Sequence, residues 1–408
     1  MERLRAPAPK PVKQRRAFSS LGGPVTTAGD AVAGRTLAAL FRVEAERARA
    51  LTHGFHSYAG RMHPTMARAA IETWSAPGGR VLDPFCGSGT VLVEALSLGR
   101  ASYGVDASPL AVLIASVRST TLGDEGRRRL VEMAAAISEE SGERARKRRR
   151  PDIPAWGRRE TERFAPHVAL ELFGLRELVM ETGDDEIGRA LRACFSSLLV
   201  KFMRAGPEAP RDGEKKRIAR GLPSGFFARR AEELARGLET LEQDSPRGTP
   251  PPIVRLGDAR GYPEVRAASV DLIVSSPPYA GTYDYAYQHE TRFTWLGLQQ
   301  RRFEETQLGG RARGLGASPQ EWLEGRRKWL GEMGRVLRAG GHTVLVVGDG
   351  VVGERHEDAA EAVAAAAPKA GLAAVARASQ ARPLRDSRLR ELLGDQQRFE
   401  HIVLLRKG

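Results

Sequence analysis

Cysteine is almost absent from this sequence. The 408 residues contain two, Cys86 and Cys194. Two thiols cannot form the disulfide framework of a small secreted domain or a cysteine-rich metal site. Long apolar runs are also missing, since no stretch reaches the roughly 18 uninterrupted apolar residues expected of a membrane-spanning helix. The N-terminus lacks the apolar core of a secretory signal. These absences favour a cytoplasmic protein with reduced thiols.

The chain is strongly basic. It carries 64 lysines and arginines against 50 acidic residues, a formal net charge of +14. This balance favours a polyanionic partner such as nucleic acid. The cations are mainly arginine, however, and alanine and glycine are also abundant, a composition that a GC-rich coding bias can produce alone. The basic charge therefore does not identify a nucleic-acid partner by itself, and the sequence motifs have to supply that evidence.

The stretch from Arg80 to Asp106 organises the rest of the chain. Its pattern predicts a strand, a turn with Gly87 and Gly89, a helix, and a second strand that ends in Asp106. Glycines let the backbone approach a ligand closely, and the start of the helix offers unpaired N–H groups. A carboxylate after the second strand suits the two hydroxyls of a ribose. The pattern is typical of the first half of a nucleotide-binding α/β unit.

Composition and periodicity divide the chain into four segments. Residues 1–34 are rich in Pro, Gly, Ser and Arg without periodicity, which predicts a disordered basic tail. Residues 35–122 hold the glycine turn, and the α/β pattern then stops. Residues 123–249 are predicted to be a helical insertion, and residues 250–408 resume the α/β pattern. The insertion carries basic clusters at Arg144–Arg150 and Lys215–Arg220, which are either a DNA-facing surface or a solvated face.

The second α/β segment contains a proline turn in an informative place. A strand from Ile253 is predicted to end near Asp258, and a buried strand at Val270–Val274 runs directly into Ser276-Pro277-Pro278-Tyr279. Neither proline has an N–H to donate, so the two cannot continue a central strand. They instead form a rigid turn beyond the carboxyl end of the strand, where open α/β sheets bind ligands.

The order of these features resembles the class I S-adenosylmethionine-dependent methyltransferases, and more narrowly the amino-methyltransferases that modify exocyclic nitrogens of DNA bases. The run DPFCGSGT at Asp83–Thr90 is similar to their cofactor motif, and SPPY at Ser276–Tyr279 is similar to their catalytic motif. The resemblance covers roughly residues 53–120 and 250–408. It implies a Rossmann-like α/β fold with a mostly parallel seven-stranded sheet, S-adenosyl-L-methionine as cofactor, and double-stranded DNA with a flipped base as partner.

The resemblance also implies the roles of individual residues. Ser276 and the carbonyl of Pro277 would accept hydrogen bonds from the target amine, Pro278 would stiffen the turn, and Tyr279 would stack on the flipped base. The residues with implied cofactor contacts are Asp83, Phe85, Gly87, Gly89, Asp106, Asp258, His63 and Pro64. A serine hydroxyl can in addition donate to the ring nitrogen beside the amine. Three tyrosines after the motif could narrow the base pocket or be ordinary core or surface aromatics, namely Tyr283, Tyr285 and Tyr287.

Several alternatives stay open. Serine as the first residue of the catalytic motif favours cytosine N4 within the family, with adenine N6 as the alternative. An RNA methyltransferase acting on a tRNA guanosine amine shares the fold, and a catalytically silent nucleic-acid-binding module is a third possibility. A metal site is not expected, because His53, His56 and His63 lack carboxylate or thiolate neighbours at ligand spacing.

Overall fold

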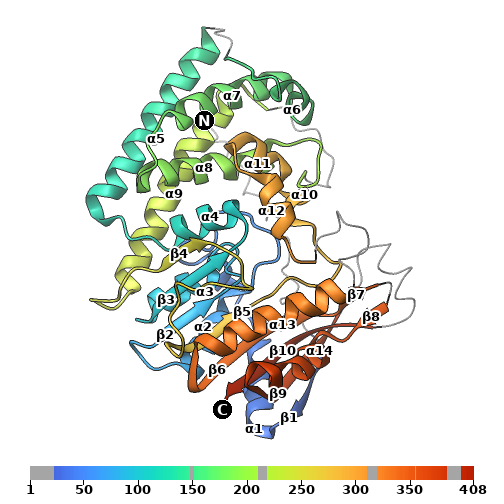
Figure 1. Ribbon diagram of the computed structural model, residues 1–408. Helices are drawn as coiled ribbons and strands as arrows, with labels where there is room; N and C mark the ends of the chain where they lie inside the picture. Colours follow the sequence, from blue (N-terminus) through green and yellow to red (C-terminus); the bar gives the residue numbers. More distant parts are fainter. Residues whose placement is uncertain (1–22, 148–150, 210–217, 310–318, 354, 384–396) are drawn as a thin grey trace, which may run out of the picture.

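The computed structural model describes residues 23–147, 151–209, 218–309, 319–353, 355–383 and 397–408. These residues form a helix-flanked sheet and a second, helical half that stands on one end of it (Figure 1). None of the helices in these ranges is both long and apolar enough to cross a membrane.

Among the described residues, eight strands form the main sheet, in the order β1-β9-β10-β6-β5-β2-β3-β4. Strands β6, β5, β2, β3 and β4 pair in parallel, whereas β10 is antiparallel to both β6 and β9, and β1 is antiparallel to β9. Their bounds are β1 Val25–Gly29, β2 Arg80–Asp83, β3 Ala101–Asp106, β4 Ile253–Leu256, β5 Val270–Ser275, β6 Leu337–Gly348, β9 Leu372–Arg382 and β10 Arg398–Lys407. A separate two-stranded ladder joins β7 (Gly350–Val352) and β8 (Arg355–Glu357). The predicted class I α/β fold is confirmed.

The N-terminal edge of the sheet differs from the prediction. Strand β1 lies inside the expected tail, and its residues from Val25 to Gly29 pair with Gln380 to Ala376 of β9. Asp30 then caps helix α1 (Ala31–Leu40) through its side chain. The predicted tail of residues 1–34 is therefore too long, and the sheet has one strand more than the seven expected. Residues 1–22 lie outside the described part of the chain.

Helices cover both faces of the sheet. On one face, the buried side chains of α1, α2 (Pro64–Trp74) and α3 (Thr90–Ser97) share a core with Val81 of β2. On the other face, α13 (Pro319–Val336) and α14 (Ala359–Ala366) share a core with Leu82, the next residue along the strand. Successive side chains of a strand point to opposite faces, so an apolar strand such as β2 supplies both cores.

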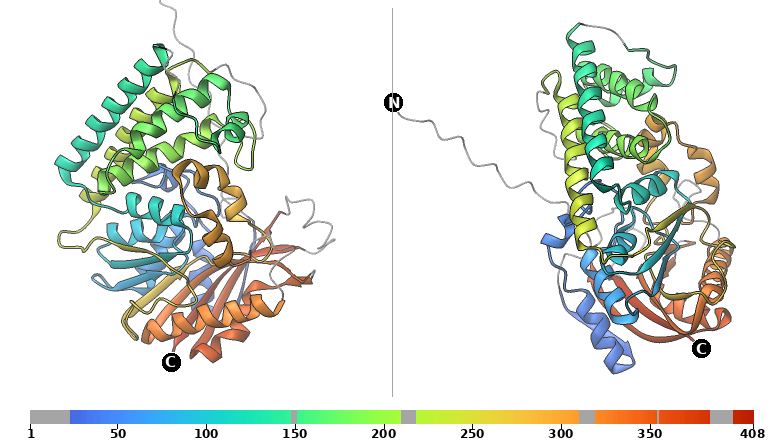
Figure 2. Two further views of the ribbon diagram at one scale, coloured as in Figure 1. Left: turned by 45° about the horizontal axis from the view of Figure 1, so that its top comes forward. Right: turned by 90° about the vertical axis from the view of Figure 1, so that its left-hand side faces the viewer.

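The helical half is built from three separate parts of the sequence. Its core joins α4 (Pro109–Arg118), the helices of the 123–249 segment, and three helices that follow the SPPY turn. The helices of the 123–249 segment are α5 Gly123–Arg146, α6 Gly157–Glu160, α7 Pro166–Met180, α8 Glu186–Phe202 and α9 Leu222–Asp244. The helices after the turn are α10 Tyr285–Gln288, α11 Glu290–Leu296 and α12 Gln300–Thr306. Two views show α11 beside α8 (Figures 1 and 2).

Trp295 of α11 is the centre of that helical core. Its side chain is fully buried, and its ring lies 4.3 Å from the ring of Phe173 in α7. Its indole N–H donates to Glu160. The boundary predicted at residue 250 therefore does not describe the packing, because residues 285–306 leave the sheet and complete the helical half. This arrangement ties the helical half directly to the SPPY turn.

Candidate active site

The cofactor-type turn lies at the carboxyl ends of β2 and β3. Asp106, the last residue of β3, accepts hydrogen bonds from the backbone N–H of Gly87 and of Ser108, each at 2.8 Å. Gly87 has a φ of +49°, a conformation that favours glycine. One carboxylate therefore fixes both the glycine turn after β2 and the start of α4 after β3.

Gly89 has a structural role that the sequence did not reveal. It caps α3 with a φ of +79°, and a Cβ added there would lie 2.9 Å from the Cα of Ala115 in α4. The glycine is required because α3 and α4 approach closely at this point. It does not line the pocket described next, and the direct cofactor contact predicted for Gly89 stays a prediction.

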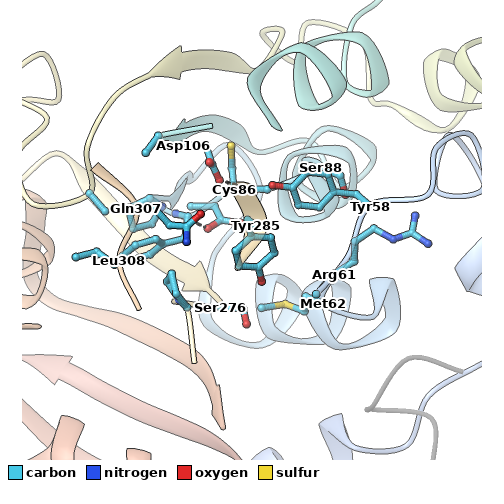
Figure 3. Close-up of a pocket in the computed structure, with 18 of the residues that line it drawn as sticks. Tyr58, Arg61, Met62, Cys86, Ser88, Asp106, Ser276, Tyr285, Gln307 and Leu308 are labelled. Carbon is cyan, nitrogen blue, oxygen red and sulfur yellow. Dashed lines mark hydrogen bonds between the residues drawn. The ribbon is translucent and has the colours of Figure 1, made fainter. Parts of the chain in front are cut away.

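A pocket opens at this edge of the sheet (Figure 3). It is lined by the turn after β2, by Asp106, and by residues from the SPPY turn and the segment before α2. Among its lining residues are Tyr58, Arg61, Met62, Asp83, Phe85, Gly87, Asp106, Asp258, Ser276, Pro278, Tyr285 and Gln307. The two motifs, which are far apart in the sequence, therefore share one cavity.

Two buried carboxyl groups give the pocket its electrostatic character. Burial raises the pKa of Asp83 to about 7, against hydrogen bonds from the Ser275 hydroxyl (2.6 Å) and the Phe85 N–H (3.1 Å) that favour the charged form. Burial likewise raises the pKa of Asp106 to about 6. The groups that donate hydrogen bonds to Asp83 and to Asp106 are backbone N–H groups and a serine hydroxyl, all of them neutral. A cation bound in the pocket would therefore favour the carboxylate form of both residues.

The SPPY turn is divided between the pocket and the sheet. Ser276 and Pro278 line the pocket, whereas Pro277 is buried outside its wall. Tyr279 is also outside the wall. The Tyr279 ring packs against Gly348 of β6, where an added Cβ would lie 2.5 Å from two of the ring carbons. The Tyr279 hydroxyl donates to Glu400 of β10 at 3.1 Å. The stacking role predicted for Tyr279 stays a prediction.

His63 and Pro64 do not reach the pocket wall. Pro64 is the first residue of α2, and the Nδ1 of His63 caps that helix by accepting from the N–H of Thr65 at 3.3 Å. Their function here is to start α2. The five residues before them line the pocket instead, from Tyr58 to Met62.

Asp258 does line the pocket, but its carboxylate is already paired. The guanidinium of Arg260 contacts both carboxylate oxygens at 2.5–2.9 Å. Lone pairs remain available for a further donor, so the predicted contact with the adenine amine stays a prediction.

The opposite wall of the pocket comes from residues after the SPPY turn, and the sequence pattern barely indicates it. Tyr285 stacks on Tyr58 with ring centroids 6.2 Å apart and lies in the middle of the pocket view (Figure 3). Gln307 lines the same side, and its side-chain oxygen accepts from the N–H of Ala286 at 2.9 Å. Tyr287 is 58% exposed and points elsewhere. Of the three tyrosines considered, Tyr285 lines the cavity, and no local sequence signal separates it from the others.

A buried polar network supports the turn from behind. Arg118 of α4 is fully buried and donates to the carbonyl and the hydroxyl of Ser88, to the carbonyl of Thr52 and to Nδ1 of His53. His53 in turn contacts Glu94 through Nε2 at 2.8 Å. Burial lowers the pKa of His53 to about 4, so the ring is neutral and its Nδ1 can accept from Arg118. His53 is thus part of the scaffold of the turn.

Residues 35–116 match the family model described as DNA methylase of the N6/N4 type. Over these residues the chain is similar to the amino-methyltransferases. It is 39% identical over 66 residues to the type II methyltransferase M.MjaII of Methanocaldococcus jannaschii, an alignment that covers 16% of this chain and 12% of the relative. It is 25% identical over 280 residues to the type II methyltransferase M.MvaI of Kocuria varians, covering 61% of this chain and 58% of the relative.

The chain therefore spans little more than half of the longer alignment partner and a small part of the other. Among solved structures, TrmN from Thermus thermophilus is similar with a TM-score of 0.34 and 15% identity, over 86% of this chain and 50% of that one. A score this low carries no argument about function.

The amino-methyltransferases that the chain resembles use S-adenosylmethionine as cofactor, and the pocket residues fit this molecule. The cofactor carries a sulfonium and an ammonium, and the buried carboxyls of Asp83 and Asp106 provide the negative charge that would pair with cations. Asp106 also stands at the end of the second strand, where a carboxylate suits a ribose. The face of the pocket formed by Phe85 is held by an edge-to-face contact with Trp329, at 5.9 Å between centroids.

Replacing Asp106 with alanine is expected to weaken the binding of S-adenosylmethionine roughly 10- to 100-fold, the loss of a hydrogen bond to a charged group. Isothermal titration calorimetry measures the change. Asp124→Ala is a matched control, because that carboxylate is 98% exposed. Asp106→Asn keeps an oxygen that can accept from Gly87 and separates loss of charge from collapse of the turn. Unchanged affinity in both Asp106 variants would place the cofactor elsewhere.

Proposed function

We propose that the chain transfers a methyl group from S-adenosylmethionine to an exocyclic amine of a DNA base, and that this amine is N4 of cytosine. One observation carries the proposal. Ser276 and Pro278 of the SPPY turn open into the same cavity as Gly87 and Asp106 of the cofactor-type turn. The preference for cytosine rests on serine as the first residue of the catalytic motif, which is an argument from the family resemblance.

The main requirement of methyl transfer to an exocyclic amine is that the protein positions the amine. An exocyclic amine is a weak nucleophile because its lone pair is delocalised into the ring. Hydrogen-bond acceptors at the amine hydrogens increase electron density on the nitrogen and hold it in line for attack. The hydroxyl oxygen of Ser276, which lines the pocket, is the first proposed acceptor. The carbonyl of Pro277 is the second, and this role rests on the family resemblance because Pro277 does not line the pocket. When bound, S-adenosylmethionine supplies an electrophilic methyl group on a positively charged sulfur.

The turn itself is built to stay rigid. Pro278 has no N–H and a fixed φ, so it cannot rearrange to bond with the substrate. The strand before it is central, since β5 lies between β2 and β6 and pairs with both. Ser275, the last residue of β5, is anchored to Asp83. The acceptor groups therefore project from a fixed end of the sheet, and the proton of the methylated amine can pass to water after transfer.

DNA is the proposed substrate, with the target base flipped out of the duplex, because the target amine cannot be reached inside the stack. The helical half stands over the pocket edge and is proposed to contact the DNA. The basic clusters predicted for this role are partly neutralised. Arg144 pairs with Glu140 and Glu177, and Lys147 pairs with Glu143. Residues 148–150 and 215–217 lie outside the described residues, and Arg220 is exposed.

The base can be identified directly. DNA methylated by the chain is digested to nucleosides and analysed by mass spectrometry, with Ser276→Ala run in parallel as the low-activity control. The expected product is N4-methylcytosine. N6-methyladenine alone would overturn the base assignment and leave the enzyme class standing. Methyl transfer to tRNA and not to DNA would overturn the proposed substrate, and no transfer to either would overturn the proposed activity.

A further inference from the structure

One wall of the pocket has little support from its own backbone. Residues 57–62 form this wall segment, and residues 58–62 within it line the pocket. The segment belongs to no helix or strand, and among the described residues none of its backbone groups pairs with another backbone group. Arg61 supports it from within, because Nη1 donates to the carbonyls of His53 and His56 at 2.7 and 3.1 Å. The rest of the support has to come from other side chains.

Helix α11 of the helical half supplies that support. Arg292 of this helix is fully buried, and its guanidinium donates twice to Ser57, the first residue of the wall segment. Nη1 donates to the backbone carbonyl at 2.8 Å, and Nη2 donates to the hydroxyl at 2.9 Å. The helical half is therefore bonded to the start of a segment that lines the cofactor-type pocket.

Glu208, in the loop after α8, holds Arg292 in this position. Oε2 of Glu208 lies 3.2 Å from Nε of Arg292, and Oε1 lies 3.1 Å from Nδ1 of His289. A guanidinium buried without a carboxylate would carry a large desolvation cost, so this pair allows Arg292 to stay charged inside the protein. One carboxylate thus orients two side chains at the start of α11.

The second of these side chains contacts the wall segment as well. His289 is fully buried, and its ring centroid lies 4.8 Å from that of Tyr58. On the pocket side, a Cβ added to Gly87 would lie 3.6 Å from Cε1 of Tyr58. The Tyr58 ring therefore reaches from α11 to the glycine turn after β2, and a displacement of either support would change the shape of the pocket.

We propose that Arg292, held by Glu208, is a positioning residue for S-adenosylmethionine, because it fixes the wall segment against the glycine turn from the helical half. Arg292 does not line the pocket, so it acts through Ser57 and the residues that follow it. The inference rests on the proposed function and extends it. The helical half, proposed above to contact DNA, also takes part in binding the cofactor.

Arg292→Lys tests the support directly. The lysine keeps a positive charge beside Glu208, but its compact ammonium cannot reproduce the fork of a guanidinium that donates to both oxygens of Ser57. The affinity for S-adenosylmethionine is expected to fall roughly 10-fold, the loss of a hydrogen bond made by a charged group. Isothermal titration calorimetry on the full chain measures the change.

Ser57→Ala removes the hydroxyl acceptor alone. Ser57 is exposed, so this variant keeps the inference testable if Arg292→Lys does not fold. The affinity for S-adenosylmethionine is expected to fall about threefold. The double variant Ser57→Ala/Arg292→Lys is expected to bind no more weakly than Arg292→Lys, because the serine hydroxyl acts through the same guanidinium.

Trypsin cleavage reports the position of the wall segment without any cofactor. Release of Ser57 from Arg292 should open the segment, so the peptide bond after Arg61 is expected to be cut several-fold faster in Arg292→Lys than in the wild type. Mass spectrometry of the fragments identifies the bond. An unchanged rate of cleavage after Arg61 would overturn the inference.

Arg176→Lys is the matched control. Nε of Arg176 in α7 donates to the backbone carbonyl of Trp295 at 2.7 Å, so this arginine also holds α11 but does not contact the wall segment. Its substitution is expected to leave cofactor affinity within about twofold, even where it lowers stability. Equal losses of affinity in Arg176→Lys and Arg292→Lys would show a general loosening of the helical half and overturn the inference.

Two further outcomes are informative. Unchanged cofactor affinity in both Arg292→Lys and Ser57→Ala would overturn the positioning role. A wild-type chain that does not bind S-adenosylmethionine would instead overturn the proposed function. Cleavage after Arg61 would still show whether Arg292 fixes the wall segment, so the two failures are distinguishable.

Discussion

Replacing Arg118 with methionine is expected to lower the free energy of unfolding by about 3 kcal/mol or more. The methionine fills much of the same space but donates no hydrogen bond. The carbonyl and hydroxyl of Ser88 would lose this donor, whereas the carbonyl of Thr52 would keep the N–H of Phe55. Each buried group that loses its partner costs roughly 1–3 kcal/mol. Nδ1 of His53 would lose its donor as well.

Urea denaturation of the apo chain measures this loss. Arg128→Met is the matched control, because that side chain is 62% exposed and its ion pairs with Glu125 and Glu132 lie on the surface of α5. Surface pairs of this kind contribute about 0–1 kcal/mol. Cofactor affinity should also fall in Arg118→Met, since Ser88 belongs to the glycine turn. Equal stability losses in the two variants would show that the buried network does not support the turn.

Much of the sheet was predictable because its signals are local. Val81 and Leu82 before Asp83, and Leu272 to Val274 before the two prolines, are short apolar runs that end in residues unable to continue a strand. Parallel strands with covered faces need such runs, and their carboxyl ends must meet at one edge. The convergence of the two motifs on one pocket follows from that rule.

The parts that were not predicted depend on contacts between distant residues. Strand β1 has five residues and forms because β9 offers a free edge about 350 positions later, as the pairing of Val25 with Gln380 shows. The sequence position of Trp295 assigns it to the second α/β segment, but in the structure its ring stacks on Phe173 in the helical half. The sequence pattern places Gly89 in a ligand-binding loop, and only the structure shows that it packs closely against Ala115. Tyr279 is likewise oriented by Glu400, which no pattern near SPPY indicates.

The neighbouring residues Ser275 and Ser276 have different surroundings in this structure, which provides a control for the catalytic role proposed for Ser276. The hydroxyl of Ser275 donates to Asp83 and favours its charged form. Ser275→Ala is therefore expected to raise the pKa of Asp83 further. If a bound cation prefers the carboxylate, the pH below which cofactor affinity falls should move upward from about 7.

Ser276→Ala is expected to lower kcat about 100-fold while cofactor affinity stays within about twofold, because removal of one group that stabilises a transition state typically costs 10²–10³ in rate. The substitution removes an acceptor at the amine and leaves the glycine turn, Asp83 and Asp106 in place. Single-turnover methyl transfer and calorimetry measure the two quantities separately. The opposite pattern, weaker cofactor binding with normal turnover, would assign Ser276 to the cofactor. If Ser275→Ala and Ser276→Ala changed kcat and cofactor affinity equally, the two hydroxyls would only stabilise the end of β5. The acceptor at the amine would then have to be the Pro277 carbonyl alone.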